Sequence, residues 1–179
     1  MMESAFPQLP GLVIGRFQPV HKGHLDALRQ AFEQEAHLLI VIGSAENDYE
    51  LDNPFTASER YQMLAAALAT TPEWQGRFSI VPIRDINNHS LWVGHLENLL
   101  PPFGVVYTGS PIVTELFLQD GKHDIHEIKK NLDLSATGVR DKILNEQEWE
   151  EDTPAGVAEL LKKWNAQNRI QTLKKNVTD

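Results

Sequence analysis

Apolar and polar residues alternate in blocks along the chain, and these blocks predict strands that alternate with helices. Short continuous apolar runs, typical of buried strands, occupy 11–14, 37–43, 78–83 and 105–107. Between the first two runs, apolar residues recur at helical spacing over 25–32. Strands that alternate with helices indicate βαβ units and a parallel sheet.

Capping signals predict where several helices begin. Thr56 and Glu59 form a capping box for a helix that reaches about Ala69. Ser110 and Ser135 have side chains suited to the N-caps of two later helices. The remaining predicted elements are a helix over 91–100, a short strand over 123–129 and helical structure over 149–179. Arg60, near the start of the capped helix, has two open interpretations: a solvated surface charge or a functional residue.

Length and composition favour one α/β domain over residues 1–179, with a C-terminal helical part from about residue 146. The expected fold is a Rossmann-like parallel sheet with helices on both faces. The net charge of −9 argues against broad nucleic-acid binding, and the absence of cysteine excludes disulfides and thiolate metal sites. No apolar run approaches the roughly 20 residues that span a bilayer. Residues 1–10 lack the pattern of a signal peptide, so a cytoplasmic location without membrane partners is expected.

The stretch G-R-F-Q-P-V-H-K-G-H, residues 15–24, joins the first strand to the first helix. His21 and His24 are three residues apart, so they share a face on the first helical turn. Unpaired N–H groups and the helix dipole favour an anion there, and two glycines allow a close backbone approach. Together with Arg16, this arrangement suits a polyphosphate. A zinc site is an alternative, but metal-binding histidine pairs on helices are usually four residues apart, and no metal ligand is assigned.

A second polar stretch begins the helix after Ser135. Ser135, Thr137 and Arg140 could form another anion site, although alone they would indicate only a capped helix with an exposed arginine. Ligands of parallel sheets bind beyond the carboxyl ends of the strands, where the strand order reverses. Because the polar stretches of the chain follow strands or precede helices, the sequence predicts one crevice that contains them.

The ten-residue stretch resembles the archaeal-type nicotinamide-nucleotide adenylyltransferases of the H-x-G-H nucleotidyltransferase superfamily. The chain is also similar to this family at I-G-S-A, N-P-F-T-A-S-E-R, W-V-G-H and P-P-F, and 135–140 is similar to its S-x-T-x-x-R element. Tyr49, Asp52, His89 and the Leu132-Asp133 neighbourhood depart from the family pattern, and these departures leave the ATP motifs intact.

The resemblance implies transfer of the adenylyl group of ATP to nicotinamide mononucleotide, forming NAD and pyrophosphate, with Mg²⁺ accompanying ATP. It implies catalytic roles for His21, His24 and Arg140. The ATP-binding residues that it implies are Gly15, Arg16, Phe17, Gln18, Gly23, Gly109, Ser135 and Thr137. The mononucleotide-binding residues that it implies are Phe17, Asp85, Asn87, His89 and Trp92.

The resemblance also suggests a homo-oligomer, and it implies that Trp92 stacks on the nicotinamide ring. The other interpretation of Trp92 is a core aromatic residue on a helix. Two alternative functions remain open. One is an adenylyltransferase for another acceptor, such as nicotinate mononucleotide or phosphopantetheine. The other is a nucleotide-sensing module without turnover.

Overall fold

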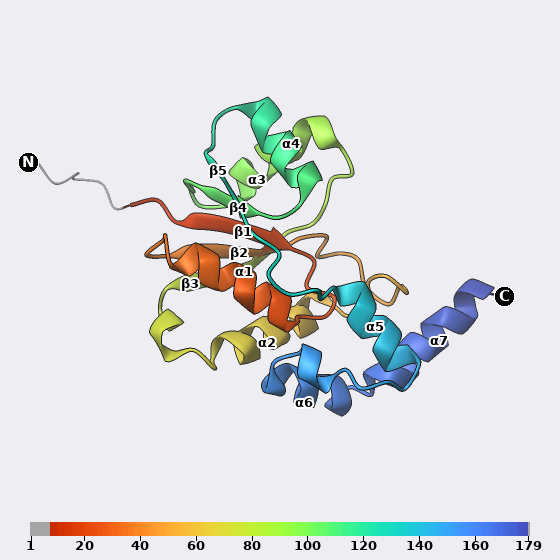
Figure 1. The fold of residues 1–179 in the computed structure, drawn as a ribbon. Helices are drawn as coiled ribbons and strands as arrows, with labels where there is room; N and C mark the ends of the chain where they lie inside the picture. The colour runs from red at the N-terminus through yellow and green to blue at the C-terminus, as the bar shows by residue number, and fades with distance from the viewer. Residues whose placement is uncertain (1–7, 179) are drawn as a thin grey trace, which may run out of the picture.

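Five parallel strands in the order β3-β2-β1-β4-β5 form the central sheet of this computed structural model, which describes residues 8–178 (Figure 1). The strands are β1 Gly11–Gly15, β2 Leu38–Ile42, β3 Phe78–Pro82, β4 Val106–Thr108 and β5 Ile125–Glu127. The helices are α1 Lys22–Phe32, α2 Ala57–Leu68, α3 His89–Leu99, α4 Pro111–Asp120, α5 Ala136–Leu144, α6 Ala155–Lys163 and α7 Ala166–Thr178. Single 3₁₀ turns lie at Pro72–Trp74 and Glu150–Asp152. The α/β Rossmann-like prediction is confirmed.

Strand β2 shows why the sheet has two cores. Its five residues are all buried, and alternate side chains point to opposite faces of a sheet. Ile40 lies in the core shared with α1, α2 and the C-terminal helices, whereas Leu39 and Val41 lie in the core shared with α3 and α4. Figure 1 shows α3 and α4 on one face of the sheet and α1 and α2 on the other. A continuous apolar run therefore indicated a strand covered on both faces.

The position of β1 determines where the chain can bind a ligand. β1 pairs with β2 on one side and with β4 on the other, so the chain runs outward from β1 through β2 to β3 and then crosses back to β4 on the other side of β1. This reversal is the topological switch point, beyond whose carboxyl end ligands of such sheets bind. The G-R-F-Q-P-V-H-K-G-H stretch begins at that end of β1.

Element boundaries differ from the predictions by one to several residues. The capping box of α2 is confirmed, because Thr56 Oγ1 accepts from Glu59 N–H and Glu59 Oε2 accepts from Thr56 N–H. α3 begins at His89, two residues before the predicted start, so His89 lies on a helix and not in a loop. The strand predicted over 123–129 is limited to Ile125–Glu127, where β5 pairs with β4.

The C-terminal helical segment contains two helices that fold back on α2. Asn165 has a left-handed backbone conformation (φ 50°), which ends α6 and separates it from α7. Arg169 on α7 forms a two-pronged ion pair with Glu59, at 2.7 and 2.8 Å. Because Glu59 also caps α2, the C-terminal segment stabilises the start of α2.

Arg60 is fully buried, so its interpretation as a solvated surface charge is wrong. Its Nε donates to the Thr56 carbonyl at the start of its own helix at 3.4 Å. Its two terminal nitrogens donate to five further backbone carbonyls at 3.0–3.3 Å, those of Arg16, Gly43, Ser44, Ala45 and Asn47. These five carbonyls belong to the loops that follow β1 and β2. Arg60 therefore holds together two loops at the carboxyl edge of the sheet.

Within residues 8–178, no helix is both long and apolar enough to cross a membrane. Residues 1–10 were predicted not to form a signal peptide. Residues 1–7 of this segment lie outside the described residues.

Candidate active site

Two cavities meet at the carboxyl end of β1. The first, here called the histidine cavity, has a volume of about 360 Å³ and is lined by His21, His24 and the segments 107–110 and 128–132, among others. The second, here called the tryptophan cavity, has a volume of about 390 Å³ and is lined by residues that include Arg16, Asp85 and Trp92. Both are lined by Ile14, Gly15 and Ser110, so the cavities adjoin at the switch point of the sheet.

The two histidines lie against each other at the start of α1. Their ring centroids are 3.8 Å apart, and His24 also contacts the ring of buried Phe17 at 4.8 Å. His24 Nδ1 accepts from the backbone N–H of His21 at 3.1 Å. Because that nitrogen accepts, the proton of a neutral His24 is on Nε2. His24 therefore stabilises the first turn of α1 with one ring nitrogen and retains the other as a hydrogen-bond donor.

Gly23 makes room for this arrangement. A Cβ atom at this position would lie 2.8 Å from His21 Nδ1 and 2.9 Å from its Cε1. At Gly15, a Cβ atom would lie 3.1–3.3 Å from the Phe17 ring. The absence of a side chain at both glycines therefore leaves space for the rings of His21 and Phe17 in the cavity wall. This role adds to the close backbone approach of a ligand that the sequence indicated.

Burial keeps both imidazoles neutral. It is the main reason that the pKa of His21 is lowered to about 4; Asp152 opposes this shift and Lys130 contributes to it. Burial also lowers the pKa of His24 well below its usual range, and His21 contributes to this shift. His21 Nδ1 is buried without a hydrogen-bond partner among the described residues. At neutral pH the pair is therefore a set of uncharged donors and acceptors.

The low pKa of His21 predicts that the protein loses stability on mild acidification. Between about pH 6.5 and 4, the unfolded chain binds a proton at this histidine and the folded chain does not, so the free energy of unfolding falls as the pH falls. The slope per histidine approaches roughly 1.4 kcal/mol per pH unit. His21→Asn retains a good N-cap residue. We expect its free energy of unfolding, measured with urea, to depend less steeply on pH, by the contribution of one histidine. Equal slopes for both proteins between pH 5 and 6.5 would contradict the prediction.

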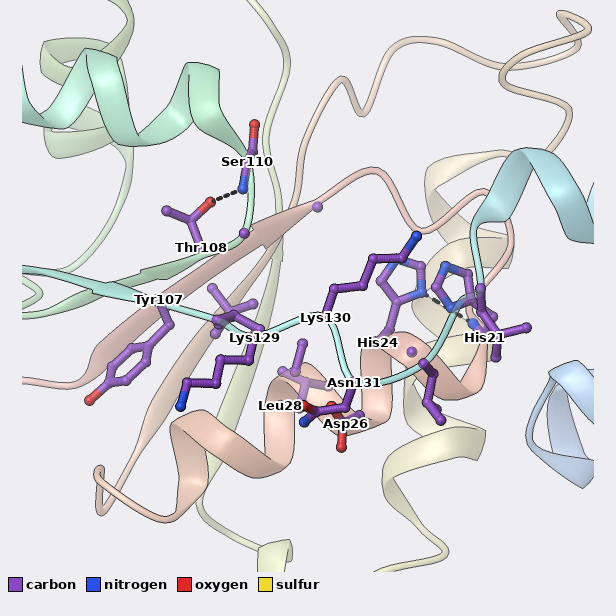
Figure 2. A pocket seen from close by; sticks show the side chains of 18 of the residues that line it. His21, His24, Asp26, Leu28, Tyr107, Thr108, Ser110, Lys129, Lys130 and Asn131 are labelled. Carbon is purple, nitrogen blue, oxygen red and sulfur yellow. Dashed lines mark hydrogen bonds between the residues drawn. The ribbon is translucent and has the colours of Figure 1, made fainter.

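The segment after β5 supplies site residues that the sequence interpretation missed. Lys129, Lys130 and Asn131 line the histidine cavity, and Figure 2 shows Lys130 extending toward the two imidazoles. Asn131 is held to Asp26 of α1 by a hydrogen bond of 2.9 Å. The available signal was Lys129 at the end of a predicted strand and Lys130 directly after it, where ligand-binding residues of parallel sheets are found.

Besides Gly15, which lines both cavities, five predicted ligand-binding residues line the tryptophan cavity together: Arg16, Asp85, Asn87, His89 and Trp92. Asp85 is fixed by hydrogen bonds from the Ser44 hydroxyl at 3.4 Å and from the Asn87 N–H at 3.1 Å. Trp92 is half-buried and makes an edge contact with Phe117 at 5.9 Å. Trp92 is therefore both a cavity wall and part of the core between α3 and α4.

The second polar stretch lies beside the histidine cavity without lining either cavity. Arg140 is buried and donates to the Gln18 carbonyl at 2.8 Å, to Asp52 at 3.1 Å and to the Thr137 hydroxyl at 3.3 Å. Ser135 caps α5 through Gly138 N–H. The Gln18 side chain is buried and exchanges two hydrogen bonds with the backbone of Phe55.

Of the other predicted ATP contacts, Gly15, Phe17, Gly23 and Gly109 line the histidine cavity. Asp52, one of the departures from the family pattern, pairs with Arg140 and thus lies on the side predicted to hold ATP.

Comparisons with known proteins identify the family of the chain. A family model described as cytidylyltransferase-like matches residues 12–142. The nicotinamide-nucleotide adenylyltransferase of Thermococcus sibiricus is 41% identical over 165 residues, covering 91% of this chain and 88% of that protein. The enzyme of the same name from Pyrococcus furiosus is 40% identical over 170 residues, covering 93% and 90%.

A solved structure shares the fold. It is a bifunctional NMN adenylyltransferase/ADP ribose pyrophosphatase from Francisella tularensis, complexed with AMP and a manganese ion, with a TM-score of 0.76 and 24% identity. The match covers 93% of this chain and 52% of that chain, so this chain spans about half the length of the bifunctional protein. The resemblance found in the G-R-F-Q-P-V-H-K-G-H stretch is thereby confirmed over most of the sequence. The chain belongs to the cytidylyltransferase-like family and, within it, to the nicotinamide-nucleotide adenylyltransferases.

Proposed function

We propose that this protein transfers the adenylyl group of ATP to nicotinamide mononucleotide, forming NAD and pyrophosphate. The observation that carries the proposal is the meeting of the two cavities at Gly15, where one ligand can reach the other. The histidine cavity offers neutral imidazole donors and two lysines, which suit a triphosphate. The tryptophan cavity offers an aromatic wall and a fixed carboxylate, which suit a pyridine ring with a carboxamide.

The reaction needs positioning more than acid–base chemistry. A phosphate oxygen of the mononucleotide attacks the α-phosphorus of ATP in line, and the bond to the pyrophosphate oxygen breaks. Because the attacking phosphate is already ionised at neutral pH, no general base is required. The protein's contribution is to align the reactants and to stabilise the charge that grows on the leaving pyrophosphate. Neutral His21 and His24 suit this task as hydrogen-bond donors.

The ion pair of Arg140 with Asp52 indicates how Arg140 could bind ATP. Arg140 is paired with Asp52, whose side chain is 78% exposed. A triphosphate that reaches the start of α5 would compete with Asp52 for the guanidinium. Ser135 and Thr137 are close to Arg140 in the sequence. A triphosphate bound to the Arg140 guanidinium would therefore also be within reach of their predicted contacts with ATP.

We propose that the divalent cation enters as Mg²⁺ bound to ATP. Asp26 is the one carboxylate among the residues that line the histidine cavity, and it already accepts from Gln30 and Asn131. The wall thus offers no carboxylate cage, which fits an ion held mainly by phosphate oxygens and water. The solved relative contains manganese, so a divalent cation has precedent in this fold.

Asp85 favours nicotinamide over nicotinate as the acceptor ring. The Asp85 carboxylate already accepts from the Ser44 hydroxyl and the Asn87 N–H, and a carboxylate can accept further hydrogen bonds. The NH₂ group of the nicotinamide carboxamide could therefore be its third donor. The carboxylate of nicotinate would place a like charge beside Asp85. The tryptophan cavity has no comparable feature that favours phosphopantetheine.

Replacing Trp92 with alanine should mainly weaken binding of the mononucleotide. Ring stacking contributes about 0.5–1.5 kcal/mol beyond burial, so we expect KM for the mononucleotide to rise roughly 2- to 10-fold, with little change for ATP. Because Trp92 also contacts Phe117, some loss of thermal stability is expected as well.

The control is Phe117→Leu, which changes the core contact of Trp92 without changing a residue that lines the cavity. If both variants raise KM for the mononucleotide equally, Trp92 acts through packing and not through stacking.

The overall proposal is tested by pyrophosphate release from ATP with a panel of acceptors: nicotinamide mononucleotide, nicotinate mononucleotide and phosphopantetheine. We expect the highest kcat/KM with nicotinamide mononucleotide. Release with none of the three, while ATP still binds, would favour a nucleotide-sensing module. The homo-oligomer and the cytoplasmic location stay predictions.

A further inference from the structure

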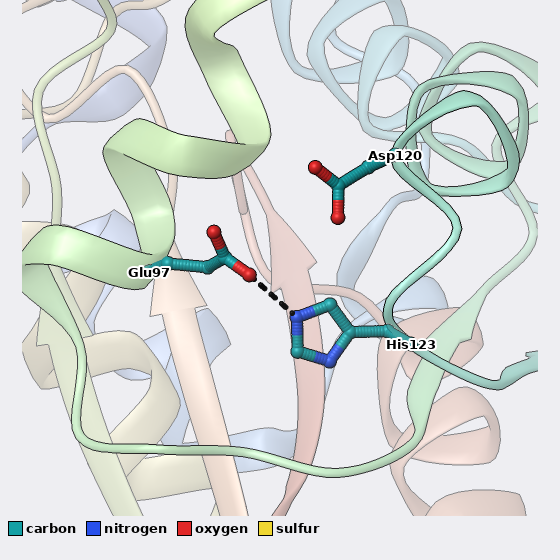
Figure 3. Close-up of side chains that lie close together, drawn as sticks. All are labelled: Glu97, Asp120 and His123. Carbon is teal, nitrogen blue, oxygen red and sulfur yellow. Dashed lines mark hydrogen bonds and ion pairs between the residues drawn. The ribbon is translucent and has the colours of Figure 1, made fainter.

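A second cluster of charged side chains lies away from both cavities. Glu97, Asp120 and His123 offer ligand atoms that all lie within 4.8 Å of one another (Figure 3). We call these three residues the Glu97 cluster. Glu97 is near the end of α3, Asp120 ends α4, and His123 precedes β5. Because α4 begins after the carboxyl end of β4 and runs back, the cluster lies at the opposite edge of the sheet from the proposed active site.

The orientation of His123 is that of a metal ligand. Its Nδ1 lies 3.2 Å from the Gly104 carbonyl, which can only accept, so Nδ1 has the proton. In the neutral ring, Nε2 then presents a lone pair to Glu97 Oε1 at 3.2 Å. Two acceptors face each other stably only when a proton or a cation lies between them. A backbone carbonyl that fixes the imidazole through its other nitrogen is the usual support of metal-binding histidines.

The surroundings of the ring make this orientation rigid. The His123 ring stacks on Phe103 at 4.3 Å with an interplanar angle of 14°, and it makes a T-shaped contact with Phe117 at 5.6 Å. The side chain is 12% exposed. The nitrogen that faces Glu97 is therefore held in place before any ligand arrives.

Within the described part of the chain, one carboxylate oxygen of Asp120 has no positive or donor group beside it. Its Oδ2 is buried and has no hydrogen-bond partner among the described residues. Its Oδ1 contacts Lys122 Nζ at 3.3 Å, and the same ammonium lies 2.9 Å from Glu97 Oε2. The Lys122 side chain is 59% exposed, so it can move out into solvent. The carboxyl ends of α3 and α4 add negative dipole charge to the same place.

We propose that Glu97, Asp120 and His123 form a binding site for a divalent transition-metal cation of the zinc class, with Lys122 occupying the site in its absence. Two carboxylate oxygens and one imidazole nitrogen are ordinary zinc ligands, whereas Mg²⁺ prefers oxygen alone. Tetrahedral bonds of about 2.1 Å place neighbouring ligand atoms roughly 3.4 Å apart. His123 Nε2 and Glu97 Oε1, at 3.2 Å, already have this spacing. The widest separation in the cluster, up to 4.8 Å, must shorten by about 1.4 Å, which side-chain rotation can supply.

Such an ion would act on structure, not on the reaction. It would join the carboxyl ends of α3 and α4 to the segment that leads into β5. The amino ends of the same two helices frame the tryptophan cavity through Trp92 and Val113. A metal at one end of the helix pair would thus fix the spacing of the cavity wall at the other end.

The test uses the full chain after removal of metals with a chelator. Calorimetric titration with Zn²⁺ should show one equivalent bound at the cluster. At a zinc concentration about a hundredfold above Kd, the melting temperature should rise by roughly 5 °C. Mg²⁺ at the same concentration should produce no such rise.

Four variants distinguish the metal site from a simple ion-pair network. Lys122→Gln removes the competing ammonium, so zinc should bind about tenfold more tightly. Asp120→Asn and His123→Gln each remove a ligand and should abolish the zinc-dependent rise in melting temperature. His126→Gln changes an exposed histidine of β5 outside the cluster and should leave zinc binding unchanged.

Two results would overturn the proposal. One is the absence of any zinc response in both the natural chain and Lys122→Gln, which would leave the cluster an ion-pair network. The other is an unchanged zinc response in Asp120→Asn and His123→Gln, which would place the ion at other histidines. If His123→Gln fails to fold because the stacking on Phe103 is lost, the nearly isosteric Asp120→Asn still decides.

Discussion

Replacing His24 with alanine is expected to lower kcat by about 10²–10³, the typical effect of removing one preorganised donor that acts on a developing negative charge. Within residues 8–178, no hydrogen bond pairs the Nε2–H of His24, whose Nδ1 accepts from the His21 N–H. As pyrophosphate departs, charge grows on its oxygens, and a donor directed there stabilises the transition state more than bound ATP. The affinity for ATP should change much less than kcat.

The alanine variant also removes the hydrogen bond to the His21 N–H and the contact with Phe17. We therefore expect it to cost about 1 kcal/mol of the free energy of unfolding as well. His24→Asn separates the two effects, since its amide oxygen can replace Nδ1 as the acceptor while no group replaces Nε2–H.

Steady-state kinetics and thermal unfolding of both variants decide the role of His24. The asparagine variant should keep most of the stability and lose nearly as much kcat as the alanine variant. Near-normal kcat in His24→Asn would show that the histidine matters only for the fold, and the assignment of the phosphate donor would be wrong.

The largest loss of stability is expected from Arg60→Met. The substitution keeps most of the buried volume but leaves five backbone carbonyls without their charged donor. Each buried group that loses its partner costs about 1–3 kcal/mol, and water can reach some of them, so we expect a loss of about 3–5 kcal/mol. Urea unfolding at constant pH measures it.

Arg29→Met is the matched control, because Arg29 is an exposed helix residue with a single ion pair to Asp26. That pair should contribute well under 1 kcal/mol. Similar losses in the two variants would mean that the Arg60 network adds little beyond an ordinary surface charge. Arg60→Met should also lower activity at temperatures where it remains folded, since the loop carbonyls that it holds adjoin Gly15.

Much of the fold follows from local patterns. The run at 37–43 predicted a doubly covered strand, and β2 is buried on both faces. Thr56 and Glu59 predicted the start of α2 because a capping box involves residues only three apart. Boundaries were less predictable where a long-range contact decides them, as at β5, whose length is set by its pairing with β4.

Part of the candidate site was predictable for the same reason. His21 and His24 share one helical turn, so their proximity required no tertiary information. The clustering of Asp85, Asn87, His89 and Trp92 follows from a single loop and the helix after it. The sequence could not indicate that Arg140 pairs with Asp52, a residue 88 positions away. Nor could it predict that Lys130 extends toward the histidines.

The sequence by itself determined the alternation of strands and helices, the position of the turn predicted to bind an anion, and the membership of the family. These features depend on periodicity and on neighbours within one or two turns. Only the tertiary structure decided that Arg60 is buried, that the two cavities adjoin at Gly15, and that Glu97, Asp120 and His123 converge. The physical reason is that a side chain's burial, its protonation and its partners depend on which distant segments surround it, and folding brings those segments together.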